Sequence, residues 1–149
     1  MTVMTKAYGE MEVDERQKIH FPRGLFGFED IHEYVLLDST QEPFYWLQST
    51  EYKDVAFILI SPMVFRPDFI LDTASEELES LRIDSFQDEN LLVFAVVTIP
   101  EDSTKMSANL QGPVIINRKD HTGRQVISTD NRWRVKHYIL EEMAESKAC

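Results

Sequence analysis

Short runs of apolar and aromatic residues recur along the chain, and polar residues with Gly, Pro, Asn and Asp separate them. Runs of this length that are rich in aromatic and β-branched residues are typical of β-strands. The pattern predicts strands at 19–21, 33–38, 44–49, 55–60, 91–99, 113–117, 125–128 and 133–139. The run LLVFAVVTI at 91–99 is apolar almost throughout, which indicates a strand that is buried on both faces.

One segment, DTASEELESLRID, has the pattern of a helix instead. Thr73 and Glu76 have the spacing of a capping box, and Leu78 and Leu81 follow at helical spacing. We therefore expect one short helix at about 74–82. A doubly wound α/β fold needs a helix between most of its strands, so the pattern favours a mostly β protein, an antiparallel barrel or sandwich.

The chain of 149 residues has no internal repeat, low-complexity tract or Pro/Gly/Ser linker, so we expect a single domain over 1–149. Residues 1–17 are mostly polar and are expected to be a less ordered extension. The acidic end at 140–149 is expected to be loose or to form a short helix. The single cysteine, Cys149, is the last residue, so no internal disulfide can form. With no signal peptide or membrane-length run, we expect a cytoplasmic protein.

Charge is distributed unevenly along the chain, whose formal net charge is −11. The part through Val114 has 8 Lys and Arg against 21 Asp and Glu, a balance of −13. Residues 115–138 carry +4, and the remainder carries −2. An acidic protein of this kind is a poor candidate for binding nucleic acid, because it repels phosphate, and a better one for attracting a basic partner.

Motifs of catalysis are missing from the sequence. The four histidines do not have the spacing of zinc ligands, and there is no G-x-S-x-G motif or phosphate-binding glycine loop. The paired acidic residues fall in predicted turns, on the predicted helix or in the tail, where solvated charge is the ordinary explanation. We therefore expect no catalytic residue, no metal and no cofactor. A small acidic β-barrel enzyme with a carboxylate pocket that the sequence does not reveal is one alternative.

The segment Arg132-Trp133-Arg134 suggests a second alternative, an RNA-binding barrel that uses base stacking and phosphate contacts. Alternation along a strand there would place Trp133, Val135, His137 and Ile139 on one face and the cations on the other. That arrangement predicts a tryptophan in the core and a charged outer face. The negative charge of the rest of the chain also disfavours direct nucleic-acid binding.

Four motifs occur in a defined order between residues 19 and 137: FPRGLFGFED, PFYWLQS, VTIPEDSTKMSANLQGPVIIN and QVISTDNRWRVKH. In these motifs the chain resembles the bacterial flagellar assembly factor FliW family, and the run that ends in NLQGPVIIN is the most specific of them. The chain departs from the family pattern at Phe26, where Pro is expected, and at Ser107, where Thr is expected.

The resemblance implies a small β-barrel-like protein that acts by binding and has no enzymatic activity. It implies two partners that exclude each other, flagellin and the RNA-binding translational regulator CsrA. When flagellin is exported, the freed protein would bind CsrA and relieve repression of flagellin synthesis. Neither direct nucleic-acid binding nor membrane binding is expected.

Candidate partner-binding residues come from three segments of the matching motifs. The aromatic residues of the first loop either anchor a partner or plug the end of the barrel. Residues of the predicted loop at 98–112 are expected at the surface or rim, and Asn109 and Asn117 are also expected to fix turns. The candidates are Phe26, Phe28, Met106, Asn109, Leu110, Arg132 and Arg134.

Overall fold

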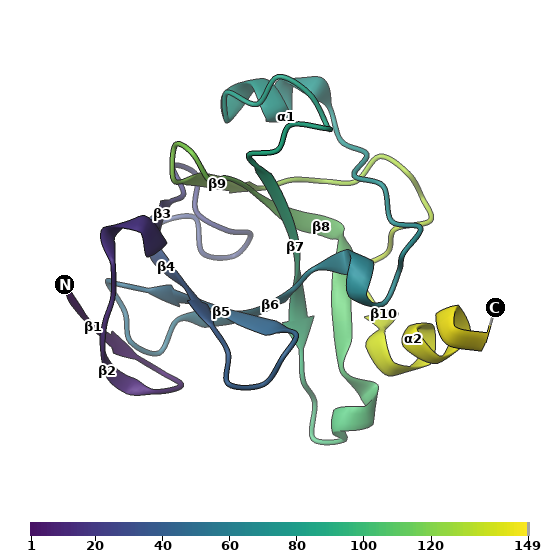
Figure 1. Ribbon diagram of the computed structural model, residues 1–149, viewed down its shortest axis with the longest axis horizontal. Coiled ribbons are helices and arrows are strands. Elements are labelled where there is room, and N and C mark those ends of the chain that lie inside the picture. Colours follow the sequence, from purple (N-terminus) through teal and green to yellow (C-terminus); the bar gives the residue numbers. More distant parts are fainter. Residues whose placement is uncertain (149) are drawn as a thin grey trace.

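A sheet that closes on itself forms the centre of the structure, a computed structural model that describes residues 1–148 (Figure 1). The strands of the barrel follow the order β8-β7-β6-β5-β4-β3-β9, and β9 pairs back to β8. All neighbours are antiparallel except β3 and β9. The mostly β, barrel-like fold predicted from the sequence is confirmed. The strands are β3 (Lys18–His20), β4 (Glu33–Asp38), β5 (Phe44–Ser49), β6 (Ala56–Ile60), β7 (Leu91–Thr98), β8 (Ser107–Asn117) and β9 (Thr122–Gln125).

The remaining elements surround this barrel. In Figure 1, α1 lies at the top of the view, and α2 lies at the lower right beside β10, which pairs with the start of β8. They are the hairpin strands β1 (Thr2–Thr5) and β2 (Gly9–Glu12), the helices α1 (Ser75–Ser80) and α2 (Ile139–Ala148), the short strand β10 (His137–Tyr138), and the 3-10 turns η1 (Glu15–Gln17), η2 (Pro62–Val64) and η3 (Ser103–Lys105).

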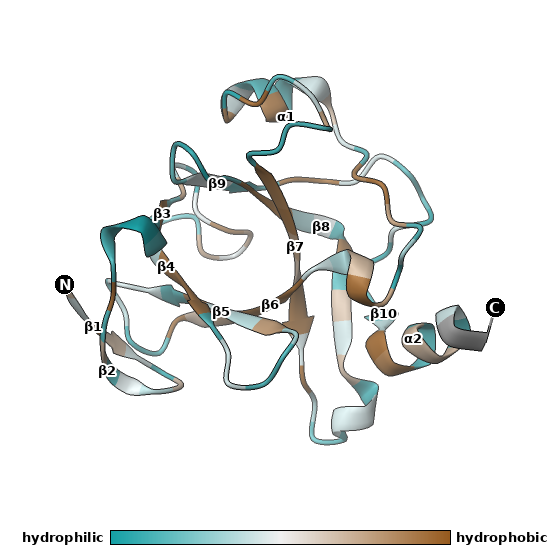
Figure 2. Ribbon diagram, viewed as in Figure 1, coloured by the Kyte–Doolittle hydropathy of each residue, from teal (hydrophilic) through white to brown (hydrophobic). Residues whose placement is uncertain are grey.

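The central strands β6, β7 and β8 pack on both of their faces. Leu59 pairs with Val96, and both belong to the cluster inside the barrel. The next residues along the two strands, Ile58 and Val97, face outward into a second cluster built around Trp133. β7 is coloured hydrophobic along its length in Figure 2. The prediction that this strand is buried on both faces is therefore confirmed.

A large bulge lengthens β8 beyond the predicted strand at 113–117. The partner of Phe94 is Val114 and that of Val96 is Asn109, so the four residues 110–113 of β8 lie opposite the single residue Ala95 of β7. The Asn109 side-chain oxygen accepts hydrogen bonds from the backbone N–H groups of Gln111 (3.0 Å) and Gly112 (2.9 Å). Turn-forming residues that predict a loop thus form a bulge inside a strand, and the turn-fixing role expected of Asn109 is confirmed.

The helix forms where it was predicted but begins differently. Its N-cap is Ala74, which makes no side-chain cap, so the predicted capping box is wrong. The Thr73 hydroxyl instead donates to the backbone oxygen of Ile127 at 2.9 Å and ties the segment before the helix to the barrel. Leu78 and Leu81 are buried, as their spacing predicts.

Two predicted strands near the C-terminus are wrong in position. β9 occupies 122–125 rather than 125–128, because pairing with β8 defines this polar strand and no apolar alternation marks it. Only 137–138 of the predicted strand 133–139 pair with β8. Trp133 is buried as expected, whereas Val135, predicted on the same face, is 53% exposed.

Regular structure is present in both predicted extensions, which differs from the less ordered start expected at 1–17 and agrees with the short-helix alternative at 140–149. Val3 and Val13 pack against Val35 and Leu37 of β4, so two buried valines anchor the N-terminal segment. At the other end α2 spans Ile139–Ala148. Cys149 lies outside the described residues. Among residues 1–148, no helix is both long and apolar enough to cross a membrane.

Candidate partner-binding site

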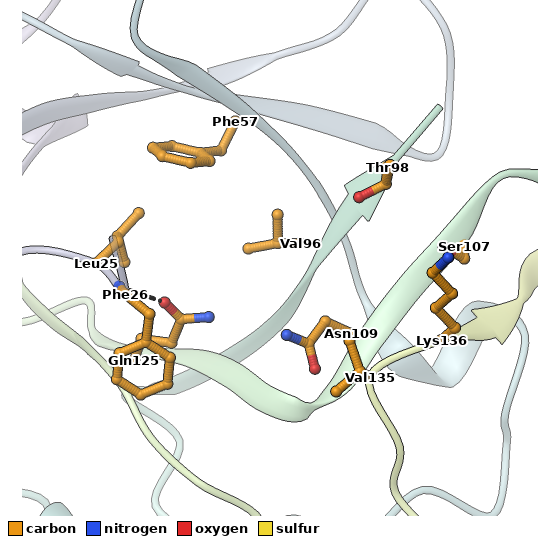
Figure 3. A pocket seen from close by; sticks show the side chains of 10 residues that line it. All are labelled: Leu25, Phe26, Phe57, Val96, Thr98, Ser107, Asn109, Gln125, Val135 and Lys136. Carbon is orange, nitrogen blue, oxygen red and sulfur yellow. Dashed lines mark hydrogen bonds between the residues drawn. The ribbon is translucent and has the colours of Figure 1, made fainter. Parts of the chain in front are cut away.

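A pocket of about 230 Å³ lies at the mouth of the barrel, on the inner face of β6, β7 and β8 (Figure 3). We call it the mouth pocket. One side of it is apolar and the other is polar. Its lining residues are Leu25, Phe26, Phe57, Val96 and Val135 with Thr98, Ser107, Asn109, Gln125 and Lys136.

The apolar side combines core residues with an exposed ring. Phe57 and Val96 pack against the cluster inside the barrel, whereas Phe26 is 50% exposed. Phe28 lies edge-on to Phe57, with the ring centroids 5.1 Å apart. The loop that carries both exposed rings turns at Gly24, whose φ of +63° suits glycine. Phe28 thus plugs the end of the barrel, which is one of the two roles expected for the aromatic residues of this loop. Phe26 instead leaves an apolar surface exposed beside the mouth.

Gln125 fixes the wall between this loop and the bulge of β8. Its side-chain oxygen accepts a hydrogen bond from the backbone N–H of Phe26 at 2.9 Å, drawn in Figure 3. Its amide nitrogen donates to the backbone oxygen of Gly112 at 2.8 Å. A Cβ atom on Gly112 would lie 3.2 Å from the amide nitrogens of both Gln125 and Asn109. Glycine at this position therefore lets the two amides approach the bulge closely.

Four residues on the polar side have hydrogen-bond donors that the protein does not use. Within the described part of the chain, no hydrogen bond is made by the hydroxyls of Thr98 and Ser107, the amide nitrogen of Asn109 or the ammonium of Lys136. Neither the Ser107 hydroxyl nor the Asn109 nitrogen is among the fully enclosed polar atoms without a partner. These donors are thus available to a ligand that brings acceptor oxygens.

The segment that carries Val135 and Lys136 is held in place by backbone hydrogen bonds. The backbone oxygen of Arg134 accepts from the N–H groups of Leu110 (3.0 Å) and Gln111 (3.1 Å). The backbone N–H of Arg134 donates to Nε2 of His137 at 2.8 Å. Because Nε2 accepts, the proton of the neutral ring lies on Nδ1.

The same histidine connects this segment to α2. The side chain of His137 is fully buried, and its Nδ1 lies 3.0 Å from the carboxylate of Glu142, which also pairs with Arg66 at 2.8 Å. Arg66 also pairs with Asp68 at 2.9 Å. The hydrogen bonds to Asp68 and Glu142 raise the pKa of Arg66, so its guanidinium stays charged. This partly buried network, in which His137 is fully enclosed, fixes the rim of the mouth pocket.

The cations near the pocket differ in how far the protein neutralises them. The Arg132 guanidinium pairs with Asp130 at 3.0 Å and lies 4.8 Å from the centre of the Trp133 ring. The backbone N–H and the side chain of Arg132 lower the pKa of Asp130 and keep it charged. Arg134 and Lys136 are exposed, and among the described residues neither side chain forms an ion pair. The free positive charge therefore lies at Arg134 and Lys136.

A second hollow of about 610 Å³ lies on the outer face of the barrel wall, over β5 and β6 and beside the β7–β8 loop. We call it the outer groove. Its walls come from the tip of the β1–β2 hairpin, the β4–β5 turn, the β7–β8 loop and the first turn of α2. Its larger apolar residues are Tyr8, Phe44, Trp46, Ile58, Ile99, Met106 and Leu140.

Acidic residues border the outer groove. They lie next to its lining residues in the β4–β5 turn, the β7–β8 loop and α2, and all are exposed. Lys105 lies 3.9 Å from Glu141, and Lys6 is the other cation nearby. Among the described residues, none that lines the mouth pocket is acidic. The acidic border consists of Glu42, Glu101, Asp102 and Glu141.

Tyr8 is the one titratable residue that lines the outer groove. Its hydroxyl oxygen accepts a hydrogen bond from the backbone N–H of Thr40 at 2.9 Å. Hydrogen bonds from the Ser39 side chain and from this N–H favour the phenolate and lower the pKa of Tyr8 to about 8.

The structure brings together some of the predicted site residues and separates others. Phe26 and Asn109 line the mouth pocket, and Met106 lines the outer groove. Leu110 is completely buried in the outer cluster, so its expected place at the surface or rim is wrong. Phe28 lies beside the mouth, and Arg132 and Arg134 flank the segment that reaches the pocket.

Sequence reasoning missed Gln125, Val135 and Lys136. Gln125 and Val135 had been assigned to ordinary strands, and Lys136 to a charged outer face. Nothing in their local pattern marks them as pocket residues, because long-range hydrogen bonds bring their segments to the mouth.

The structure lacks the features that the enzyme alternative and the RNA-binding alternative require in the described part of the chain. No Asp or Glu is buried in the described part of the chain, so neither hollow offers the buried carboxylates that the enzyme alternative needs. Trp133 is 1% exposed and cannot stack on a base. Residues 1–148 contain no group of three or more His, Cys, Asp or Glu that could hold a metal ion.

Known proteins match this chain over nearly all of its length. The family model described as FliW protein matches residues 2–139. A flagellar assembly factor FliW of Treponema denticola is 46% identical, with 96% of each chain covered. That of Treponema pallidum is 45% identical over 99% of this chain and 97% of its own. A crystal structure of a flagellar assembly factor FliW superposes with a TM-score of 0.83 at 32% identity, covering 93% of this chain and 96% of the other.

Proposed function

Because this chain belongs to the FliW family of flagellar assembly factors, we propose that it acts by binding flagellin and a CsrA-type RNA-binding regulator, one at a time. In this proposal the protein works in the cytoplasm without catalysis. Flagellin occupies it when abundant, and the free regulator then represses flagellin mRNA. Once flagellin is exported, the protein sequesters the regulator and synthesis resumes. Mass action decides which partner is bound.

The observation that carries this proposal is the presence of two hollows on opposite faces of the barrel wall, which meet at β6 and at the start of β8. Consecutive residues alternate between them: Phe57 lines the mouth pocket and Ile58 the outer groove, and likewise Ser107 and Met106. A partner that shifts β8 at one hollow also changes the wall of the other. Packed sheets move between discrete arrangements, so such coupling supports mutual exclusion.

The charge of the chain supports a further part of the proposal. An RNA-binding regulator presents a basic face, and a partner of net charge −11 docked beside it repels RNA phosphate. The acidic surface then contributes to RNA release, and this contribution weakens with salt.

A gel shift with purified components tests the proposal. The regulator is first bound to the leader of flagellin mRNA, then this protein is added, and flagellin monomer follows. We expect this protein to release the RNA and flagellin to restore binding. RNA binding that is unaffected by the protein would refute the proposal. Repeating the release at rising salt measures the contribution of the acidic surface. A release that does not depend on salt would contradict that contribution and leave the rest of the proposal standing.

A further inference from the structure

A second hollow adjoins the mouth pocket at Phe26. This side pocket, of about 330 Å³, shares Phe26 and Gln125 with the mouth pocket. Its apolar lining comes from Ala74, Val126 and Ile127, and Ile127 is 54% exposed. Its charged residues, Arg124 and Glu77, pair with each other at 2.6 Å and leave no free charge. The exposed ring of Phe26 thus lines both the side pocket, which has no unpaired charge, and the mouth pocket, which has one apolar and one polar side.

Size indicates what kind of ligand fits. Ligand pockets for small molecules are usually about 300–1,000 Å³, and the mouth pocket is about 230 Å³. A single anchoring side chain of a protein partner suits this volume better than a cofactor does. An extended peptide directs alternate side chains to the same face. Two such side chains of one segment can therefore enter the hollows on both sides of Phe26.

Polarity indicates the chemistry beside the anchor. The residues with unused donors, Thr98, Ser107, Asn109 and Lys136, line the side of the pocket across from Leu25 and Phe57 (Figure 3). Lys136 brings a full positive charge, and Arg134 adds another on the same segment, with no acidic residue among the lining residues. A carboxylate satisfies this donor set with charge-assisted hydrogen bonds.

We propose that the mouth pocket and the side pocket form one binding groove for an extended segment of flagellin in which an apolar residue lies next to an Asp or Glu. This inference rests on the proposed function for the identity of the partner. Of the two proposed partners, the RNA-binding regulator must present basic surface to phosphate, and Lys136 and Arg134 repel such a surface. The groove therefore belongs to the other partner.

Charge reversal tests the assignment with a matched control. Lys136→Glu removes the free cation of the pocket, and Phe26→Ser removes the ring between the hollows while leaving its backbone hydrogen bond to Gln125. Lys53→Glu is the control, because Lys53 is also exposed, forms no side-chain ion pair among the described residues and changes the net charge equally. Circular dichroism verifies that each variant is folded, and calorimetry measures the Kd for flagellin monomer and for the regulator.

We expect Lys136→Glu and Phe26→Ser each to weaken flagellin binding about tenfold, as the loss of an interface anchor does. Binding of the regulator should change less than about twofold, the scatter of near-neutral surface substitutions, and Lys53→Glu should change neither. If both variants bind flagellin like wild type, or weaken both partners equally, the groove assignment is overturned. If the wild-type protein binds neither partner, the proposed function fails and the assignment falls with it.

The chemistry of the segment can be read by cross-linking. Val135→Cys in a Cys149→Ser background places a single thiol at the 53% exposed position beside Lys136. A photoreactive group attached there should cross-link to a flagellin segment with an acidic residue within about two positions of an apolar one, the reach of alternate side chains. Capture of a segment without an acidic residue would contradict the proposal.

Discussion

The mouth pocket and the outer groove lie on opposite faces of the barrel wall, where they share β6, but they differ in charge and in shape. The mouth pocket is small, lies on the inner face and is bordered by the free cations Arg134 and Lys136. The outer groove is larger, lies on the outer face and is bordered mainly by carboxylates. Strand alternation places the two hollows on opposite faces of the barrel wall, and the loops and termini around each hollow give it its charge. The acidic border of the outer groove suits a basic partner, so we infer that the regulator binds there and that flagellin binds at the mouth pocket.

The largest expected effect is the loss of both hollows together, caused by a substitution that destabilises the fold around them. Trp133 is fully buried, packs on Phe69 with the ring centroids 4.8 Å apart, and belongs to the cluster beneath the outer groove. Trp133→Ala should lower the free energy of unfolding by about 3–5 kcal/mol. It should also weaken the binding of both flagellin and the regulator. Urea denaturation followed by circular dichroism measures the loss. Val135→Ala is the control, at under about 0.5 kcal/mol, and a Trp133→Ala loss below that value would contradict this account.

A smaller change should damage the mouth pocket alone. Gln125→Ala removes the acceptor for the Phe26 N–H and the donor to the Gly112 oxygen. We expect a loss of about 2 kcal/mol in unfolding free energy and weaker flagellin binding, with the regulator unaffected. Thermal unfolding and calorimetry report the two effects. Gln41→Ala at the exposed border of the outer groove is the matched control, and equal losses for the two glutamines would argue against a structured mouth.

The reciprocal change concerns the acidic border. Glu101 is exposed in the β7–β8 loop between two lining residues of the outer groove. Glu101→Lys should weaken regulator binding about two- to fivefold at low salt, the range of exposed ion pairs, and leave flagellin binding unchanged. Glu89→Lys, an exposed acidic residue in a distant turn, controls for net charge. Surface plasmon resonance at two salt concentrations gives both values, and a weakening of flagellin alone would reverse the assignment.

The smallest expected effect depends on pH. The pKa of Tyr8 is lowered to about 8, below its usual value of 10, by hydrogen bonds to its oxygen. A group with a depressed folded-state pKa adds stability as the pH rises from the folded toward the unfolded value, so the contribution grows between about pH 8 and 10 and is lost as the pH falls through about 8. Phenolate absorbance at 295 nm should show a transition near pH 8 that Tyr8→Phe abolishes.

This ionisation also separates the two hollows. The phenolate adds negative charge to the outer groove, so regulator binding should tighten slightly between pH 7 and 9, and flagellin binding should not follow Tyr8. Two results would contradict this role of Tyr8. One is a tyrosine absorbance transition near pH 10 alone, and the other is an equal pH dependence of regulator binding in Tyr8→Phe and wild type.

The sequence predicts the parts of this fold that local pattern determines. β4 and β5 lie at the predicted residues, and Leu78 and Leu81 mark the helix correctly. The bulge of β8 was missed because Asn109 and Gly112 give the same turn signal in a loop and in a bulge. The shift of β9 has a similar cause, since a polar strand is defined by its partner.

The candidate site was only partly predictable for a related reason. Phe26 and Asn109 were identified through the family motifs, whereas Gln125 and Lys136 reach the pocket through contacts between distant segments. Leu110 was misplaced because the bulge turns its side chain into the outer cluster. The charge difference between the two hollows depends on which loops meet in space, and no local pattern records that.

Hydrogen–deuterium exchange of this protein with each partner tests most directly whether the two hollows serve different partners. Flagellin should protect backbone amides in 24–28 and 134–136, which border the mouth pocket. The regulator should protect 6–10 and 99–106, which border the outer groove. Protection of the same segments by both partners would contradict the account, because flagellin and the regulator would then compete for one surface.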